Sequence, residues 1–261
     1  MSTFLSTVID LNRYPLNDED FQQKCKRTLD ETGVLVISDF LNEDAIQSVQ
    51  QEGVKNQNLA YYTANKHNIY LSPSDSSFPS DHPRNREINS TKGCITTDQI
   101  PSESILHSIY AAAIFRDFLC AVLGEVALYE YADNLSSINL HYASEGQELG
   151  WHFDNSSFAI TLMVQSANTG GAFEYVKDVR DADNGEMNYE LAGDILDQKV
   201  PTQSLEINAG DLVLFRGRNS MHRVTPVVGS RTRMMVVLAY NTEPNISLSE
   251  SARMTFFGRL G

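Results

Sequence analysis

Basic residues and long apolar runs are scarce in this chain of 261 residues, and each scarcity excludes a class of protein. Lys and Arg number 20 against 34 Asp and Glu, so the formal net charge is −14. Nucleic acids and anionic membranes are bound through Lys and Arg, and an acidic surface repels their phosphates. No apolar run approaches the roughly 18 residues that a membrane-spanning helix needs. We therefore expect neither nucleic acid nor a membrane as a partner.

Cysteine is also scarce, and the three residues present, Cys25, Cys94 and Cys120, form no CxxC pattern. An odd number of widely spaced cysteines is typical of a reducing compartment. The first residues show no basic segment followed by the long apolar core of a secretory signal. The sequence therefore predicts a cytoplasmic protein. No repeat or linker divides it, so we expect residues 1–261 to form a single domain.

The first 124 residues are predicted to form a helical portion. Acidic residues open each of its early helices and suit the positive end of the helix dipole, and glycines follow two of the helices. We expect helices at 17–32, after Asn42 and at 102–123, with a strand at 34–37.

Residues 56–101 have a different composition, rich in Asn, Ser, Pro, Tyr and Asp with few apolar clusters. A structureless stretch of this length inside a domain is usually functional, so we interpret it as a lid or binding loop. Arg84 and Arg86 lie within it and could form an anion clamp.

Residues 125–261 change to the period of two that is typical of β-strands. Many short strands with turn residues between them indicate a sandwich or barrel. The predicted fold class is therefore α+β, a jelly-roll core backed by an N-terminal helical layer. We expect strands at 126–131, 137–142, 158–164, 171–176, 204–207, 211–215, 222–226 and 233–240.

Three residues of the predicted sheet form a candidate metal site. His152 and Asp154 are two positions apart, and in an extended segment such residues point to the same side. His222 follows about 70 residues later within another predicted strand. Two imidazoles and one carboxylate on one face, with coordination positions left open, are the ligand set of non-haem Fe(II) oxygenases.

An arginine follows this candidate site. Arg231 lies nine residues after His222, at the start of an apolar strand, and can reach into the same barrel. A buried guanidinium needs an anionic partner that it can bind with two hydrogen bonds, and a dicarboxylate chelating the iron would be one. Arg233 is two residues further on and would share the same face of that strand.

These residues, with Gly170-Gly171-Ala-Phe173 and Gly210-Asp211-Leu-Val-Leu-Phe215, resemble the double-stranded β-helix core of Fe(II)/2-oxoglutarate-dependent oxygenases. The resemblance implies that His152, Asp154 and His222 hold Fe(II) and that Arg231 binds the far carboxylate of 2-oxoglutarate, with O2 as the oxidant. Tyr142 matches a tyrosine that in several relatives hydrogen-bonds the same co-substrate. His141, its neighbour, is then expected to be structural or to support the metal ligands without binding the metal.

The sequence around His152, Gly-Trp-His-Phe-Asp-Asn-Ser-Ser-Phe, is similar to that of the radical amino-acid halogenases and their hydroxylase relatives. In halogenating members a glycine replaces the carboxylate ligand and opens a position for chloride. This sequence keeps Asp154, so the resemblance implies hydroxylation.

The expected substrate is a small molecule, a free amino acid with lysine as the first choice. An α-carboxylate would suit Arg84 or Arg86, and an ammonium group would suit Glu130, Asp133 or Asn155. Two alternatives stay open at this point: the same chemistry on a peptide or small natural product, and a non-catalytic jelly roll that acts as a binding module. The sequence does not predict an oligomeric state.

Overall fold

The structure is a computed structural model, and it describes residues 2–261. Seven α-helices and two short 3-10 helices occur in this range. They are α1 Ser2–Val8, α2 Glu19–Thr32, α3 Glu43–Asn56, η1 Gln57–Leu59, η2 Thr97–Gln99, α4 Ile105–Ala111, α5 Ala113–Leu123, α6 Tyr189–Leu196 and α7 Glu250–Phe257.

The strands form one large curled sheet and one small pair. They are β1 Val34–Ile37, β2 Tyr61–His67, β3 Ile88–Ile95, β4 Ile138–Ala143, β5 Leu149–His152, β6 Ala159–Gln165, β7 Thr169–Gly170, β8 Phe173–Val176, β9 Gln203–Leu205, β10 Leu212–Phe215, β11 Met221–Val224, β12 Val227–Val228 and β13 Arg233–Leu238.

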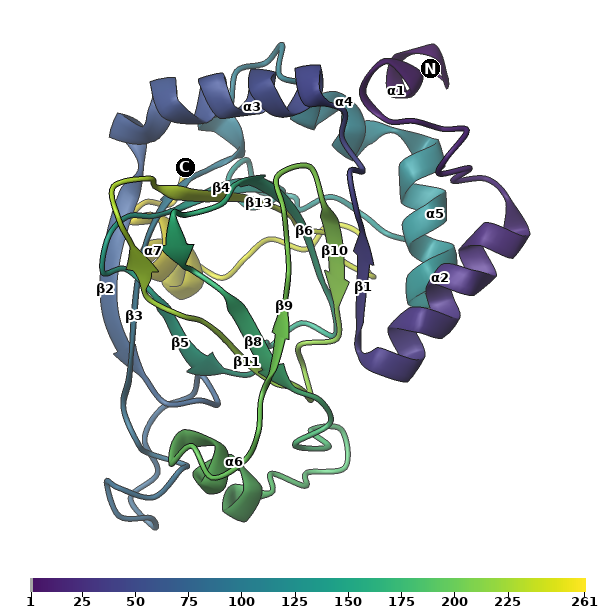
Figure 1. Ribbon diagram of the computed structural model, residues 1–261. Helices are drawn as coiled ribbons and strands as arrows, with labels where there is room; N and C mark the ends of the chain where they lie inside the picture. The colour runs from purple at the N-terminus through teal and green to yellow at the C-terminus, as the bar shows by residue number, and fades with distance from the viewer. Residues whose placement is uncertain (1) are drawn as a thin grey trace.

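The eleven-stranded sheet has the order β1-β10-β6-β13-β4-β3-β5-β11-β8-β9, with β2 added beside β3, and β7 pairs with β12. Every pairing is antiparallel, and Figure 1 shows the sheet curling back on itself. This is the predicted jelly-roll core in an α+β protein.

Helices α1 to α5 cover the outer face of the sheet beside β1, β10, β6, β13 and β4 (Figure 1). Side chains alternate along a strand, so one face of each of these strands can be wholly apolar. The largest hydrophobic cluster joins that face to the helices, and it includes Leu140, Leu162, Leu214 and Val236. The other face of the same strands lines the inside of the curled sheet.

Helix boundaries follow the predicted capping signals. The Asp18 carboxylate accepts a hydrogen bond from the Phe21 backbone N–H at the start of α2, and Asn42 caps α3 in the same way. The helix predicted at 102–123 is two helices, because the chain turns by 58° at Ala112. Between residues 2 and 261, no single helix is long and apolar enough to cross a membrane.

Three expectations are wrong. Residues 56–101 are not structureless throughout, because they contain β2 and β3, which pair from Tyr61–Cys94 to His67–Ile88. Residues 68–87 between these strands have no helix or strand. Residue 124 does not divide helices from sheet, since β2 and β3 precede it in addition to β1, the strand predicted at 34–37. The stretch 126–131 is not a strand and forms only one isolated bridge, Tyr129 with Asn241.

Candidate active site

The two candidate histidine ligands meet because their strands are neighbours. Strand β11 pairs with β5, and His222 lies directly opposite His152 in the register. Residues opposite each other in an antiparallel pair have Cβ atoms roughly 5 Å apart. The two imidazole centroids are 4.2 Å apart, and both side chains are buried inside the curled sheet.

Asp154 completes the group from the segment just beyond β5. Its Oδ1 lies 3.7 Å from His152 Nε2 and 3.5 Å from His222 Nε2. The three potential ligand atoms lie within 4.8 Å of one another, and no other such cluster occurs among residues 2–261. The structure therefore brings together the triad that the sequence predicts.

Hydrogen bonds fix which nitrogen of each imidazole faces the centre of the triad. His152 Nδ1 lies 2.7 Å from the Gly150 carbonyl oxygen, and His222 Nδ1 lies 3.0 Å from that of Ser220. A carbonyl oxygen only accepts, so both Nδ1 atoms donate and both Nε2 atoms are directed away from these carbonyls. A carbonyl acceptor on the far nitrogen is the usual support of a metal-binding imidazole.

Electrostatics hold two ligands in the protonation state that a metal requires. Burial, together with the neighbouring His222, lowers the pKa of His152 to about 3. Burial alone would raise the pKa of Asp154, but the adjacent imidazoles and Lys92 outweigh it and bring the value to about 2. At neutral pH the site therefore offers a neutral imidazole and a carboxylate, ready to bind a cation.

Gly217 leaves the space that Asp154 occupies. A Cβ atom at position 217 would lie 1.9 Å from Asp154 Oδ2, and the Gly217 carbonyl accepts a hydrogen bond from the Asp154 backbone N–H at 3.0 Å. Arg180 stacks over the Phe153 ring at 4.2 Å and donates to the Asp154 carbonyl oxygen. The carboxylate ligand is therefore held on a tightly packed backbone. The sequence analysis did not identify Gly217, because no motif in the sequence indicates that the Asp154 side chain packs against this glycine.

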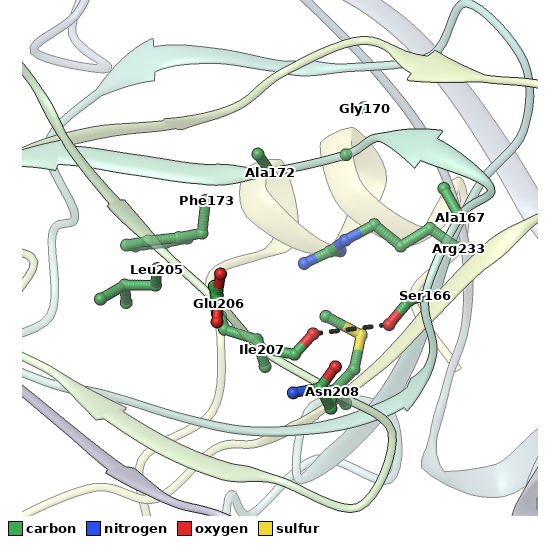
Figure 2. A pocket seen from close by; sticks show the side chains of 12 residues that line it. Ser166, Ala167, Gly170, Ala172, Phe173, Leu205, Glu206, Ile207, Asn208 and Arg233 are labelled. Atoms are coloured by element: carbon green, nitrogen blue, oxygen red, sulfur yellow. Dashed lines mark hydrogen bonds between the residues drawn. The ribbon is translucent and has the colours of Figure 1, made fainter.

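A cavity of about 430 Å³ lies beside the triad, between β8, β9 and the loop after β6. Figure 2 shows the Arg233 side chain pointing into the middle of this cavity. Phe173 lines the cavity and also stacks on the His222 imidazole, with centroids 5.5 Å apart. The cavity thus ends one side chain away from the metal ligands.

Arg233 is a buried cation without an anionic partner. The residue is 6% exposed, and its Nε has no hydrogen-bond partner. The guanidinium makes one hydrogen bond, from Nη2 to the Met235 sulfur at 3.9 Å. Burial lowers its pKa to about 10. A Cβ at Gly171 would lie 2.9 Å from Arg233 Cδ, so the Gly170-Gly171 motif makes room for this side chain. The arrangement suits a carboxylate entering the cavity.

The prediction that Arg231 reaches into the barrel is wrong. Its side chain is exposed, and its backbone N–H donates to Asn168 Oδ1 in a surface bend. Strand β13 begins at Arg233, so the alternation that would place both arginines on one face does not extend back to position 231. Arg233 occupies the place predicted for Arg231.

Tyr142 does not lie where the resemblance implies, because its side chain is on the outer face of β4 and that of its neighbour His141 is on the inner face. Tyr142 lies on the outer face of β4, fully buried against α3, where its hydroxyl donates to the Gly53 carbonyl oxygen at 2.8 Å. His141 lies on the inner face, with Nδ1 3.5 Å from Lys92 Nζ. The alternation along β4 was correctly predicted, but its phase was not.

The five residues predicted to bind substrate are not brought together. Arg84 donates to the Pro73 carbonyl oxygen, and Arg86 pairs with Asp197 at 2.6 Å. Glu130 is exposed on the surface. Asn155 follows the Asp154 ligand but is exposed, and its carbonyl oxygen accepts from Arg218.

Asp133 likewise has a structural role. Its carboxylate accepts hydrogen bonds from the backbone N–H groups of Leu135, Ser136 and Leu248.

The family model for Halogenase D matches residues 17–255. The chain belongs to this family. The match covers most of the chain, including all three residues of the triad. No curated protein matches the chain.

Solved structures share the fold of this family member at low identity. They include an oxidoreductase of the 2OG-Fe(II) oxygenase family from Burkholderia pseudomallei, with 13% identity, 87% of this chain and 93% of the other covered, and a TM-score of 0.53. A prolyl hydroxylase in complex with a hypoxia inducible factor peptide, from Trichoplax adhaerens, has 14% identity, coverage of 85% and 89%, and a TM-score of 0.56.

A third similar structure is the epimerase SnoN in complex with Fe3+, alpha ketoglutarate and nogalamycin RO. It has 10% identity to this chain, coverage of 85% and 84%, and a TM-score of 0.55. Family and fold together place the chain in the Fe(II)/2-oxoglutarate-dependent oxygenase superfamily. Its residues fit the cofactors of that superfamily: the triad offers two imidazoles and a carboxylate for Fe(II), and the unpartnered Arg233 offers a carboxylate site for 2-oxoglutarate.

Proposed function

We propose that this enzyme hydroxylates an unactivated C–H bond of a free amino acid, with lysine as the first substrate to test. When bound at the triad, Fe(II) with 2-oxoglutarate and O2 would supply the oxidant, and succinate and CO2 would be the co-products. The observation that carries the proposal is the convergence of Asp154 with His152 and His222 beside the unpartnered Arg233.

The chain's own residues would bind and orient the reactants. His152, Asp154 and His222 would hold the metal through Nε2, a carboxylate oxygen and Nε2. Arg233 would bind the far carboxylate of the co-substrate with two N–H donors, and the Phe173 ring would close the space beside His222. The buried position of these groups would keep bulk water away from the reacting centre.

Asp154 supports hydroxylation as the outcome. Its carboxylate would occupy a metal position that halogenation needs for chloride, and Gly217 provides the room for that carboxylate. The cavity of about 430 Å³ around Arg233 falls in the usual size range of small-molecule sites, which suits 2-oxoglutarate as its occupant.

The test uses purified protein with Fe(II), ascorbate, 2-oxoglutarate and chloride, offered each of the common amino acids in turn. We expect one of them to stimulate succinate release and to gain an oxygen atom by mass spectrometry. Asp154→Gly should abolish hydroxylation, while the matched variant Asn155→Gly at the exposed neighbouring position should retain it.

Three results would contradict the proposal in different ways. A chlorinated product from the parent protein would show that Asp154 does not exclude halide. Iron and 2-oxoglutarate binding without stimulation by any amino acid would remove the substrate class and leave the peptide or natural-product alternative. A protein that binds neither would be the non-catalytic jelly roll.

A further inference from the structure

A second cation lies on the inner face of the sheet, and the roles assigned above do not use it. Strands β3 and β4 are neighbours, with Cys94 opposite His141 in the register. Lys92 is two residues before Cys94 and therefore shares its face. The Lys92 ammonium lies 3.5 Å from His141 Nδ1, and both side chains are at least partly buried.

The His141 imidazole is suited to hold this ammonium group in place. Burial, with the nearby charges of Lys92 and Arg233, keeps the pKa of His141 well below its usual value. A neutral imidazole can accept from Lys92, which has only donors. Phe256 from α7 lies against the other side of Lys92, with Nζ 5.8 Å from the ring centroid.

Lys92 has no carboxylate partner among residues 2–261 within ion-pair distance. Burial lowers its pKa, against the opposing influence of Cys94 and Asp154. Lys92 is in turn one of the groups that lower the pKa of Asp154, so the two charges act on each other across the inside of the sheet. Asp154 is committed to the metal, which leaves the ammonium group without an anion of its own.

The inner face thus offers three positions for anionic groups: the metal triad, Arg233 and Lys92. A 2-oxoglutarate molecule has two carboxylates, which the metal and Arg233 would bind. We infer that Lys92, held in place by His141, binds a carboxylate group of the substrate. This inference rests on the proposed function, because it assumes that 2-oxoglutarate occupies the metal triad and Arg233 and leaves only Lys92 for the substrate.

The test compares Lys92→Met with Lys66→Met. Lys66 lies on the partner strand of the same hairpin, exposed and paired with Glu87 at 3.3 Å, so its removal takes away an equal charge outside the site. Each protein is loaded with Zn(II) and 2-oxoglutarate, which prevents turnover. Acetate is then titrated, with the neutral acetamide as the control probe, and thermal stability is followed.

We expect acetate, but not acetamide, to stabilise the parent protein and Lys66→Met. In Lys92→Met the apparent affinity for acetate should fall at least tenfold, while the dissociation constant for 2-oxoglutarate, measured calorimetrically, should change less than twofold. Any amino acid that binds the parent should lose affinity in parallel with acetate, and its carboxamide should bind Lys92→Met and the parent equally.

Two results would overturn the inference. One is acetate stabilisation that is absent from the parent or persists in Lys92→Met. The other is a loss of 2-oxoglutarate affinity in Lys92→Met with acetate binding unchanged, which would assign the ammonium group to the co-substrate. The failure of the proposed function is distinguishable, because it would appear as the absence of any amino-acid-stimulated turnover, whatever the acetate result.

Discussion

The outer and inner faces of β4 and β13 differ in the charged and titratable side chains that they carry. The outer face consists of apolar side chains packed under the helical layer, together with one tyrosine whose hydroxyl is hydrogen-bonded. The inner face carries His141 and Arg233, with Lys92 beside them on β3. The outer residues of the two strands are Ile138, Leu140, Tyr142, Met234, Val236 and Leu238.

This difference shows how one pair of strands divides two tasks between odd and even positions. Apolar burial on the outer face stabilises the sheet, while the inner face can hold cations that lack partners and reduce stability. A change on one face should therefore alter stability with little effect on ligand affinity, and a change on the other face should do the reverse.

The largest effect is expected from Leu140→Ala on the outer face. Leu140 is 2% exposed, and its truncation leaves a cavity among the side chains under α3. We expect the free energy of unfolding to fall by about 2–5 kcal/mol, as measured by denaturant titration. The affinity for 2-oxoglutarate below the unfolding transition should be unchanged; a tenfold loss would show that the faces are coupled.

Arg233→Met on the inner face should lower the affinity for 2-oxoglutarate by a comparable free energy and leave the stability of the fold intact. Loss of a buried guanidinium that binds a carboxylate costs roughly 2–5 kcal/mol in affinity, so 2-oxoglutarate should bind at least about thirtyfold more weakly. The unfolding free energy should stay the same or increase, because an unpartnered charge is removed. Arg231→Met is the matched control, and calorimetric titration should show no change in it. Weak binding in the control instead would restore Arg231 as the anchor.

His141→Gln should reduce the pH dependence of stability. The pKa of His141 is lowered by burial, Lys92 and Arg233, so in acid the unfolded chain binds a proton that the folded chain does not. Its contribution is therefore lost as the pH falls below the unfolded value near 6.5. Denaturant titrations of the metal-free protein at several pH values should show a shallower slope in the variant. An unaltered slope would mean that His141 is protonated in the folded state.

The smallest effect is expected from Tyr142→Phe. The variant loses one buried hydrogen bond, from the hydroxyl to the Gly53 carbonyl oxygen, at a cost of about 1 kcal/mol in unfolding free energy. Its affinity for 2-oxoglutarate should equal that of the parent. A clear loss of affinity would return Tyr142 to the role that the family resemblance implied.

The metal triad could be predicted from sequence because its geometry depends on local rules. His152 and Asp154 are separated by two positions in extended chain, and His222 lies in a strand that is recognisable by its apolar alternation. That the two strands are neighbours follows from the fold that the resemblance implies. Each of these inferences tolerates an error of a residue or two in a strand boundary.

The anion-binding residues could not be placed in the same way. Arg231 was chosen over Arg233 because it lies nine residues after His222, although the predicted strand begins at 233, as β13 does. Tyr142 was chosen over His141 from the family resemblance, and the structure places its side chain on the other face of β4. Strand β3 lacked a continuous apolar pattern, because its inner face carries Ser90 and Lys92, so it was interpreted as part of a loop. The predicted cytoplasmic location stays a prediction.

The contact between Gly217 and Asp154 makes the metal centre unequally tolerant of change. Shortening the side chain at position 154 would leave a hole that a small ion or solvent could fill. Adding a methyl group at position 217 would force an atom into the space that the Asp154 carboxylate already takes. A search for a new reaction in this scaffold should therefore shorten residue 154 and keep glycine at 217, since any side chain at 217 would meet the carboxylate ligand.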